Sequence, residues 1–398
     1  MQIITFGCRL NTFETAVMKQ LTADKLDDVI MIHTCAVTAE AERQCRQAIR
    51  QVARQHPDKK IIVAGCAAQL HPEIFAQMPE VYRVLGNHEK LDIATLLNGD
   101  KVAVGDLSDP APDIPLIHEI EGRNRAFLQI QQGCDHACTF CVVHTLRGKN
   151  TGLPPEHVLD QAQLFVTQGF PEIVLTGVDV ASYPYGLWPL TKRLLTEVKG
   201  LQRLRFGSLD PASVGDDLLD LLANHENLMP YIHLSVQSGD DLILKRMGRR
   251  HTRADVIRFS ERLHQIRPNA TLGADFIAGF PTETQTQFQH TLDLIQEAQI
   301  THTHIFPYSA RTGTPAAKMP QVPKSERIER AAQARALGQA FYQKALDNMV
   351  GKTVSILVEQ TGIGYTENYF PVRTGQPELA GRIIKACIKR KEQDELVI

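Results

Sequence analysis

Short apolar runs alternate with longer amphipathic stretches along most of this sequence, and this alternation restricts the fold more than any other feature. The first hundred residues predict strands at Gln2–Phe6, Val29–His33 and Ile61–Ala64, and a helix at Glu40–Arg54. Strands that are separated by helices pair in parallel, because the helix carries the chain back to the same end of the sheet. We therefore expect an N-terminal domain with an open parallel α/β sheet at residues 1–105.

A second series of strands and helices begins after a proline-containing segment, residues 106–125, which we interpret as a linker. Helical segments such as Ala254–Ile266 separate the next six predicted strands, which are Phe127–Gln131, Glu172–Thr176, Arg203–Ser208, Ile232–Val236, Leu272–Ile277 and His302–Phe306. Six such units predict a partial (β/α) barrel over residues 126–348, which ends in a long helical stretch, Lys324–Asn348.

The last part of the chain, residues 349–398, has a different pattern. Two β-rich segments, Thr353–Val358 and Arg382–Ile388, are separated by several glycines and a proline. We expect a small C-terminal β domain here. A chain of 398 residues is long enough for three units of these sizes, each with a core of its own.

Composition excludes some classes of protein. No apolar stretch approaches the roughly 20 residues that cross a bilayer, and the N-terminus lacks the features of an export signal. We therefore expect a cytoplasmic protein without a membrane partner. The net charge of -2 gives no overall attraction to nucleic acid, so RNA contacts would depend on local basic patches. Two candidate patches, which could equally be solvated surface, are Arg43, Arg46, Arg50 and Arg54 on one helix face, and Arg382, Lys385, Lys389, Arg390 and Lys391 in the tail.

Three cysteines, Cys134, Cys138 and Cys141, lie in one short loop directly after a predicted strand. In a reducing compartment cysteines serve metals or catalysis more often than disulfides. Three thiolates on a four-iron cluster leave one iron open for a ligand. A zinc site with His136 or His144 as fourth ligand is the alternative, although zinc sites normally show paired C-x-x-C spacing. The spacing favours an iron–sulfur cluster, and we predict that these three cysteines form the catalytic centre.

A second set of three cysteines follows three different predicted strands. Cys8, Cys35 and Cys66 come directly after the strands that end at residues 6, 33 and 64. The carboxyl ends of parallel strands meet at one edge of a sheet, so these thiols can converge on a second metal cluster. The alternative is that they are ordinary small buried residues.

The two remaining cysteines are expected to be structural. Cys45 shares an apolar helix face with Ile49 and Val52, and Cys387 lies in the β-rich tail, far in sequence from both triplets.

These motifs resemble those of the radical S-adenosylmethionine (SAM) methylthiotransferase family over essentially the whole length. The matching segments are Phe6–Asn11, His33–Thr38, Ala64–Cys66 and Gly133–Cys141. The resemblance implies an auxiliary-cluster domain at residues 1–105, a radical SAM core domain at residues 126–348 and an RNA-binding, TRAM-like β domain at residues 349–398. It also implies SAM and two [4Fe-4S] clusters, one on each cysteine triplet.

The resemblance implies a reaction and partners as well. The branch that the sequence resembles most adds a methylthio group to carbon 2 of N6-threonylcarbamoyladenosine at position 37 of tRNA, in the anticodon loop. One SAM donates a methyl group to sulfur at the auxiliary cluster, and a second is cleaved to a deoxyadenosyl radical. A reductant such as flavodoxin or ferredoxin and a sulfur donor are implied as further partners.

SAM contacts are expected at the strand ends of the barrel, where such folds build active sites. Family matches there, and beside the last cysteine of the loop, are Phe140, Gly177, Ser208, Asp210 and Gln237. Ordinary turn chemistry is the alternative explanation for these positions. Asp210 stands where a glutamate is commoner in the family, and Asp179 where Asn or His is commoner. The loop Val142–Lys149 follows the cysteines and is expected to border the substrate.

Two other functions remain open at this stage. A sibling enzyme would act on N6-isopentenyladenosine in tRNA or on an aspartate of a ribosomal protein, and the loop Val142–Lys149 does not distinguish these branches. A zinc-dependent RNA-binding protein without enzymatic activity is the alternative from a different class.

Overall fold

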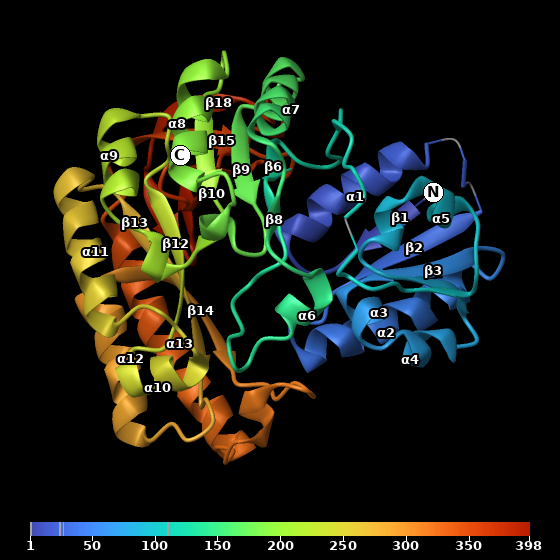
Figure 1. The fold of residues 1–398 in the computed structure, drawn as a ribbon. Coiled ribbons are helices and arrows are strands. Elements are labelled where there is room, and N and C mark those ends of the chain that lie inside the picture. The colour runs from blue at the N-terminus through green and yellow to red at the C-terminus, as the bar shows by residue number, and fades with distance from the viewer. Residues whose placement is uncertain (1, 24, 27, 110) are drawn as a thin grey trace.

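The computed structural model describes residues 2–23, 25–26, 28–109 and 111–398. An N-terminal parallel sheet, a larger α/β barrel and a C-terminal β sheet follow one another along the chain (Figure 1). This arrangement confirms the expected mixed α/β class with parallel sheets. No helix in the described parts of the chain is long and apolar enough to cross a bilayer.

The N-terminal sheet has five parallel strands in the order β1-β2-β3-β4-β5. Their bounds are β1 Gln2–Thr5, β2 Val29–Thr34, β3 Lys60–Gly65, β4 Val81–Leu85 and β5 Val102–Ala103. The helices are α1 Arg9–Leu21, α2 Ala39–Gln55, α3 Cys66–Leu70, α4 Pro72–Ala76 and α5 Ile93–Leu97.

Apolar side chains alternate between the two faces of this sheet, because successive strand residues point in opposite directions. Val29 and Met31 of β2 pack with α1, whereas Ile30 and Ile32 pack with α2. The α1 side also joins the core of the barrel through Leu128. The first sheet and the barrel are therefore held together by a shared apolar core on the α1 side.

The barrel consists of two short parallel sheets, in the orders β10-β9-β6 and β11-β12-β13-β14. The strands are β6 Arg125–Gln129, β9 Glu172–Thr176, β10 Arg203–Phe206, β11 Ser208–Leu209, β12 Tyr231–Gln237, β13 Thr271–Ala278 and β14 Ile300–Pro307. An isolated parallel bridge between Leu204 and Leu228 links the first half of β10 to the chain before β12. Among the described residues no pairing joins β6 to β14, so the barrel is partial, as predicted.

The barrel helices cover the outside of these strands (Figure 1). They are α7 Pro155–Thr167, α8 Leu187–Glu197, α9 Asp216–Asn224, α10 Asp241–Met247, α11 Arg253–Ile266, α12 Gln285–Glu297 and α13 Lys324–Asp347. A short antiparallel pair, β7 Gln131–Gln132 and β8 Thr151–Gly152, brackets the loop that carries three cysteines and α6 Val143–Arg147. Figure 1 shows α6 between the barrel and the N-terminal sheet.

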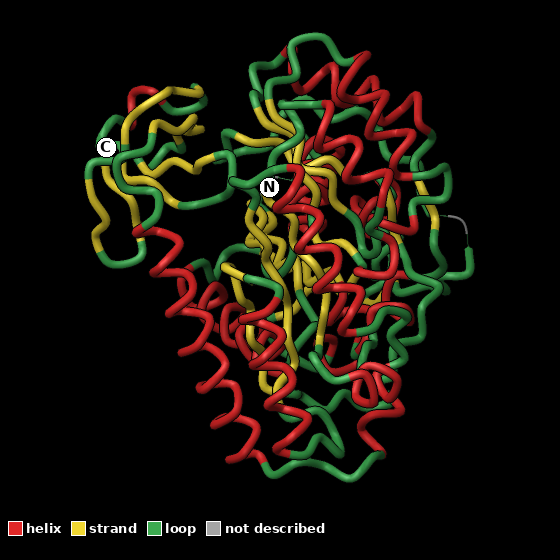
Figure 2. The backbone as a smooth tube through the Cα atoms, turned by 90° about the vertical axis from the view of Figure 1, so that its left-hand side faces the viewer, coloured by secondary structure: helices red, strands yellow, loops and turns green. Residues whose placement is uncertain are grey.

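The C-terminal sheet has six strands in the order β18-β15-β16-β17-β20-β19. The strands are β15 Thr353–Val358, β16 Ile363–Thr366, β17 Pro371–Arg373, β18 Ile383–Cys387, β19 Arg390–Glu392 and β20 Glu395–Val397. Figure 2 shows them gathered at one end of the long helix α13.

This sheet closes the floor of the barrel, where the strands begin. Arg205 donates to the carbonyl oxygens of Glu367 and Thr366, at 2.7 and 2.9 Å, and Arg203 donates to that of Tyr365 at 3.2 Å. Both guanidinium groups are buried and also face Glu172. The shortest of these contacts is 3.0 Å, between Arg205 Nε and Glu172 Oε1. The floor is therefore a buried ionic layer that the C-terminal sheet completes.

One of the sequence predictions needs correction. The predicted strand Arg203–Ser208 is two strands, because β10 ends at Phe206 and β11, beginning at Ser208, pairs with the other sheet. The segment 106–125, predicted as a linker, packs on the barrel: Ile117 is fully buried and its backbone exchanges hydrogen bonds of 2.7 and 2.8 Å with Gln161 of α7. The boundaries at residues 105, 125 and 348 stay predictions.

Candidate active site

The first cysteine triplet lies at the carboxyl ends of three neighbouring strands. Cys8 follows β1 and precedes α1, Cys35 follows β2, and Cys66 is the first residue of α3 after β3. The three thiols are close enough to influence one another's ionisation. Gly7, at a φ of 95°, lets the first segment come close, because a Cβ there would lie 3.0 Å from the Sγ of Cys35. The structure therefore brings these predicted residues together.

A buried polar network supports this triplet. Its members, all at most 2% exposed, are Asn11, Glu14, His33, Asn87, Lys90 and Arg147. Lys90 donates to Glu14 and to Asn87, both at 2.7 Å, and its Nζ lies 3.0 Å from His33 Nε2. Two cations share the single carboxylate of Glu14, and despite its burial Arg147 and Lys90 hold its pKa well below the usual range. Glu14 is therefore ionised at neutral pH.

Arg147 joins the two cysteine regions. It is the last residue of α6, which follows the second triplet, and its Nε lies 3.2 Å from the Sγ of Cys66. The same guanidinium donates to Asn11 at 2.7 Å and forms an ion pair with Glu14. The sequence predicted that this loop borders the substrate. For Arg147 the structure shows a buried contact with the first triplet instead.

The second triplet occupies the loop between β7 and α6. Backbone N–H groups donate to two of its sulfurs, from His136 to Cys134 at 3.4 Å and from Val143 to Cys141 at 3.3 Å. The third sulfur, of Cys138, lies 3.6 Å from Nη1 of Arg249. Donors aimed at sulfur stabilise thiolates and are among the groups that tune iron–sulfur clusters.

The buried thiols of both triplets are suited to binding a metal cluster. Burial raises the pKa of Cys35 to about 11 and that of Cys134 to about 11, so without a metal ion these thiols would stay protonated and unreactive. A bound cation supplies the charge that deprotonates a thiol in such a place. In each triplet an arginine also approaches one sulfur. For the zinc alternative, Nε2 of His136 lies 3.2 Å from Asp179, so its Nδ1 would have to be the fourth ligand.

The predicted SAM contacts lie around the carboxyl ends of the barrel strands. Phe140, beside Cys141, packs edge-on against Phe280, with ring centroids 6.4 Å apart. Gly177 follows β9, where a Cβ would come 2.7 Å from the carbonyl oxygen of Gln131. Ser208 is exposed on β11. Gln237, the last residue of β12, has a φ of 75°. Such backbone strain in a non-glycine residue is typical of functional sites.

Asp210 has a different environment from the other four residues. It is buried and lies 3.2 Å from Arg249 and 3.1 Å from Arg250. Burial would raise the pKa of this carboxyl, but the two guanidinium groups lower it below its usual value. Asp210 also accepts from the backbone N–H of Ala212 at 2.9 Å. Its observed contacts hold Arg249 in place beside Cys138.

Sequence reasoning missed four of the residues that surround the triplets, namely Glu14, Lys90, Arg147 and Arg249. Arg147 lies 81 residues from Cys66 and Arg249 lies 111 residues from Cys138, and charged residues of these types are normally found on the surface. The basic run Arg249-Arg250 beside Gly248 was the one local signal.

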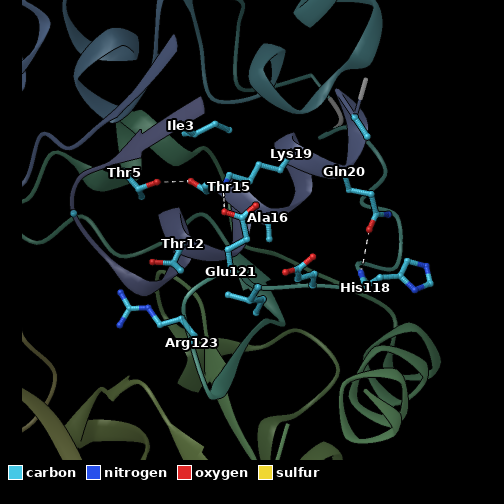
Figure 3. A pocket seen from close by; sticks show the side chains of 14 residues that line it. Ile3, Thr5, Thr12, Thr15, Ala16, Lys19, Gln20, His118, Glu121 and Arg123 are labelled. Atoms are coloured by element: carbon cyan, nitrogen blue, oxygen red, sulfur yellow. Dashed lines mark hydrogen bonds and ion pairs between the residues drawn. The ribbon is translucent and has the colours of Figure 1, made fainter. Parts of the chain in front are cut away.

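A polar cleft lies between α1 and the segment 118–123 (Figure 3). Gly7, which lines the cleft, directly precedes Cys8 of the first triplet. Lys19 forms an ion pair with Glu121 across the cleft, and Gln20 accepts from the backbone N–H of His118 at 3.0 Å. These contacts fix the segment against α1.

Replacing the two remaining cysteines tests whether either of them binds iron. Cys45 is fully buried on α2 behind Cys35, whereas Cys387 is exposed on β18 rather than packed. We expect Cys45→Ala and Cys387→Ser to keep full iron content after anaerobic reconstitution, because neither belongs to a triplet. The matched variant Cys35→Ala should lose about half of the iron, measured per chain. Loss of iron in Cys45→Ala with retention in Cys35→Ala would contradict the assignment.

Family models match two parts of the chain. Residues 128–295 match the Radical SAM superfamily, and residues 1–86 match Uncharacterized protein family UPF0004.

Several curated relatives match nearly the whole chain. The threonylcarbamoyladenosine tRNA methylthiotransferase MtaB of Rickettsia prowazekii is 45% identical over 97% of this chain and 94% of its own length. The MtaB protein of Bacillus subtilis is 32% identical over 96% and 92%. The tRNA-2-methylthio-N(6)-dimethylallyladenosine synthase of Ruegeria pomeroyi is 34% identical over 97% and 95%.

A solved structure has a similar fold. The radical S-adenosylmethionine methyltransferase TsrM from Kitasatospora setae superposes with a TM-score of 0.53 over 78% of this chain and 69% of that chain, at 16% identity. At this identity the likeness concerns the fold alone.

Proposed function

We propose, because this chain belongs to the radical SAM tRNA methylthiotransferase family, that it adds a methylthio group to carbon 2 of N6-threonylcarbamoyladenosine at position 37 of tRNA. The substrate is proposed from one relative, which is 45% identical to this chain and whose name states that nucleoside. Carbon 2 of adenine bears only hydrogen, so acid–base chemistry offers no leaving group. An iron–sulfur cluster at Cys134, Cys138 and Cys141 would supply the electron that cleaves SAM reductively.

Each triplet is proposed to hold a [4Fe-4S] cluster, with the auxiliary one at Cys8, Cys35 and Cys66. What supports this is the convergence of three thiols at one sheet edge and the guanidinium of Arg147 beside one of them. Arg147 and Arg249 would offset the negative charge of the thiolates. The buried network around Glu14 would keep the loop of the second triplet packed against the first triplet.

The remaining site residues are proposed as SAM contacts from their places at the barrel edge, namely Phe140, Gly177, Ser208, Asp210 and Gln237. The proposed domains are residues 1–105 for the auxiliary cluster, 126–348 for SAM and 349–398 for RNA, with 106–125 connecting the first two.

Lys385 and Lys389 are exposed on the C-terminal sheet, where they could meet phosphates. A base in the anticodon loop is single-stranded and can be splayed into a pocket without breaking a duplex. A reductant and a sulfur donor are required as partners.

Two tRNA substrates test the branch. We expect reconstituted enzyme with SAM, a reductant and a sulfur source to methylthiolate tRNA that carries N6-threonylcarbamoyladenosine. It should leave tRNA with N6-isopentenyladenosine unchanged, because a carboxylate-bearing and an apolar substituent need opposite pockets. Mass analysis of the nucleosides measures both products. Product from the isopentenyl tRNA alone would move the chain to the branch of the Ruegeria pomeroyi relative.

A further inference from the structure

Three side chains from neighbouring strands of the barrel, none of them a cysteine, converge on one point. His233 stands on β12, Asp275 on β13 and His304 on β14, and these strands pair in parallel. Asp275 Oδ1 lies 3.1 Å from His233 Nε2 and 3.1 Å from His304 Nδ1. The three potential ligand atoms all lie within 4.8 Å of one another.

These separations suit a shared metal ion. Donor atoms held about 2.1 Å from one ion lie roughly 3.0 to 3.4 Å apart in octahedral or tetrahedral geometry. Two of the three separations already have that length. Two imidazoles and a carboxylate are a donor set that binds Zn²⁺ or Fe²⁺ and leaves further coordination positions open.

The surroundings of His233 fit a ligand. Its Nδ1 lies 2.9 Å from the hydroxyl of the buried Tyr231, which leaves Nε2 to face Asp275. Metal-bound histidines normally use their second nitrogen in such a hydrogen bond. Gly273 faces the same pair, and a Cβ there would come 2.4 Å from both His233 Nδ1 and the Tyr231 hydroxyl. Glycine at this strand position makes room for the pair.

Asp275 differs from several buried carboxylates of this domain. Glu172, Asp210 and Glu283 lie against arginines. In the described part of the chain the ion-pair partners of Asp275 are the two imidazoles. The side chain of His304 is 59% exposed, so the cluster is open to solutes on the β14 side.

We propose that His233, Asp275 and His304 bind one divalent transition-metal ion in addition to any iron held by the cysteines. With three protein ligands, the ion would keep positions open on the exposed side for water or an oxygen ligand. This site does not depend on which base the enzyme modifies.

Zinc is the probe that tests this site. The reconstituted holoenzyme is dialysed against micromolar Zn²⁺ and then against zinc-free buffer, and metals per chain are measured by mass spectrometry. We expect one zinc in the unaltered chain and almost none in Asp275→Asn or His304→Ala, with the iron content unchanged. X-ray absorption at the zinc edge should show nitrogen and oxygen neighbours at about 2.0–2.1 Å.

His290→Ala is the matched control. His290 is a half-exposed imidazole whose Nδ1 lies 2.8 Å from Asp240, but it belongs to no three-ligand group among the described residues. This variant should keep the zinc. Equal zinc in the unaltered chain and both site variants, or none in the unaltered chain, would overturn the proposal. So would zinc–sulfur distances of about 2.3 Å, which would place the ion on the cluster cysteines.

Discussion

Replacing Cys134, Cys138 and Cys141 together with alanine is expected to abolish reductive cleavage of SAM and to leave about half of the iron. The three sulfurs lie in one loop, where they receive N–H donors from His136 and Val143. Alanine removes every thiolate of this loop but keeps the backbone, so the first triplet should still assemble its cluster. Iron per chain and deoxyadenosine release from SAM are the two measurements.

The reciprocal variant provides the control for this loss. Alanine at Cys8, Cys35 and Cys66 should also halve the iron but leave cleavage of SAM without tRNA largely intact. Methylthiolated nucleoside should be absent with both variants. Full iron in either variant would contradict the two-cluster proposal.

Glu14→Gln is expected to cause the largest loss of stability. Glu14 is fully buried and is the shared partner of Lys90 and Arg147. Glutamine has nearly the same shape but no charge, so it leaves two buried cations without their counter-ion. Breaking a buried ion pair in this way costs about 3–5 kcal/mol. Chemical denaturation followed by circular dichroism measures the change.

Glu40→Gln is the matched control on the neighbouring helix α2. Glu40 forms an ion pair with Arg43 at 2.6 Å, and both side chains are more than half exposed. An exposed pair of this kind contributes little, so this variant should unfold at nearly the denaturant concentration of the unaltered chain. Equal midpoints for Glu14→Gln and the unaltered chain would show that the buried network does not hold the two regions together.

The parts of the site that follow from local sequence were predictable. Cys8, Cys35 and Cys66 each follow an apolar run, and parallel pairing of those runs is enough to place them at one edge. The contacts of Glu14 with Arg147, 133 residues away, depend instead on how α6 docks on the first sheet. No local pattern encodes that docking. The short strands of the C-terminal sheet were also missed, because segments such as Pro371–Arg373 are too short to show a period.

The contacts at the barrel floor change one expectation from sequence. A basic tail that only grips RNA could be removed from about Val350 onward with little effect on cleavage of SAM. In the structure that removal would leave Arg203 and Arg205 without the carbonyl oxygens of residues 365–367. The barrel floor would lose these hydrogen bonds and its cover, so we expect the shortened chain to lose stability as well as affinity for tRNA.

The same floor has a consequence for how the chain is made. The arginines of β10 leave the ribosome about 160 residues before their carbonyl partners. During that interval Glu172 is the described counter-ion that these guanidinium groups already have, so we expect the lower end of the nascent barrel to stay hydrated. The C-terminal sheet can therefore complete the barrel only late in synthesis. We expect a chain that stops before this sheet to be digested faster by proteases than the whole chain.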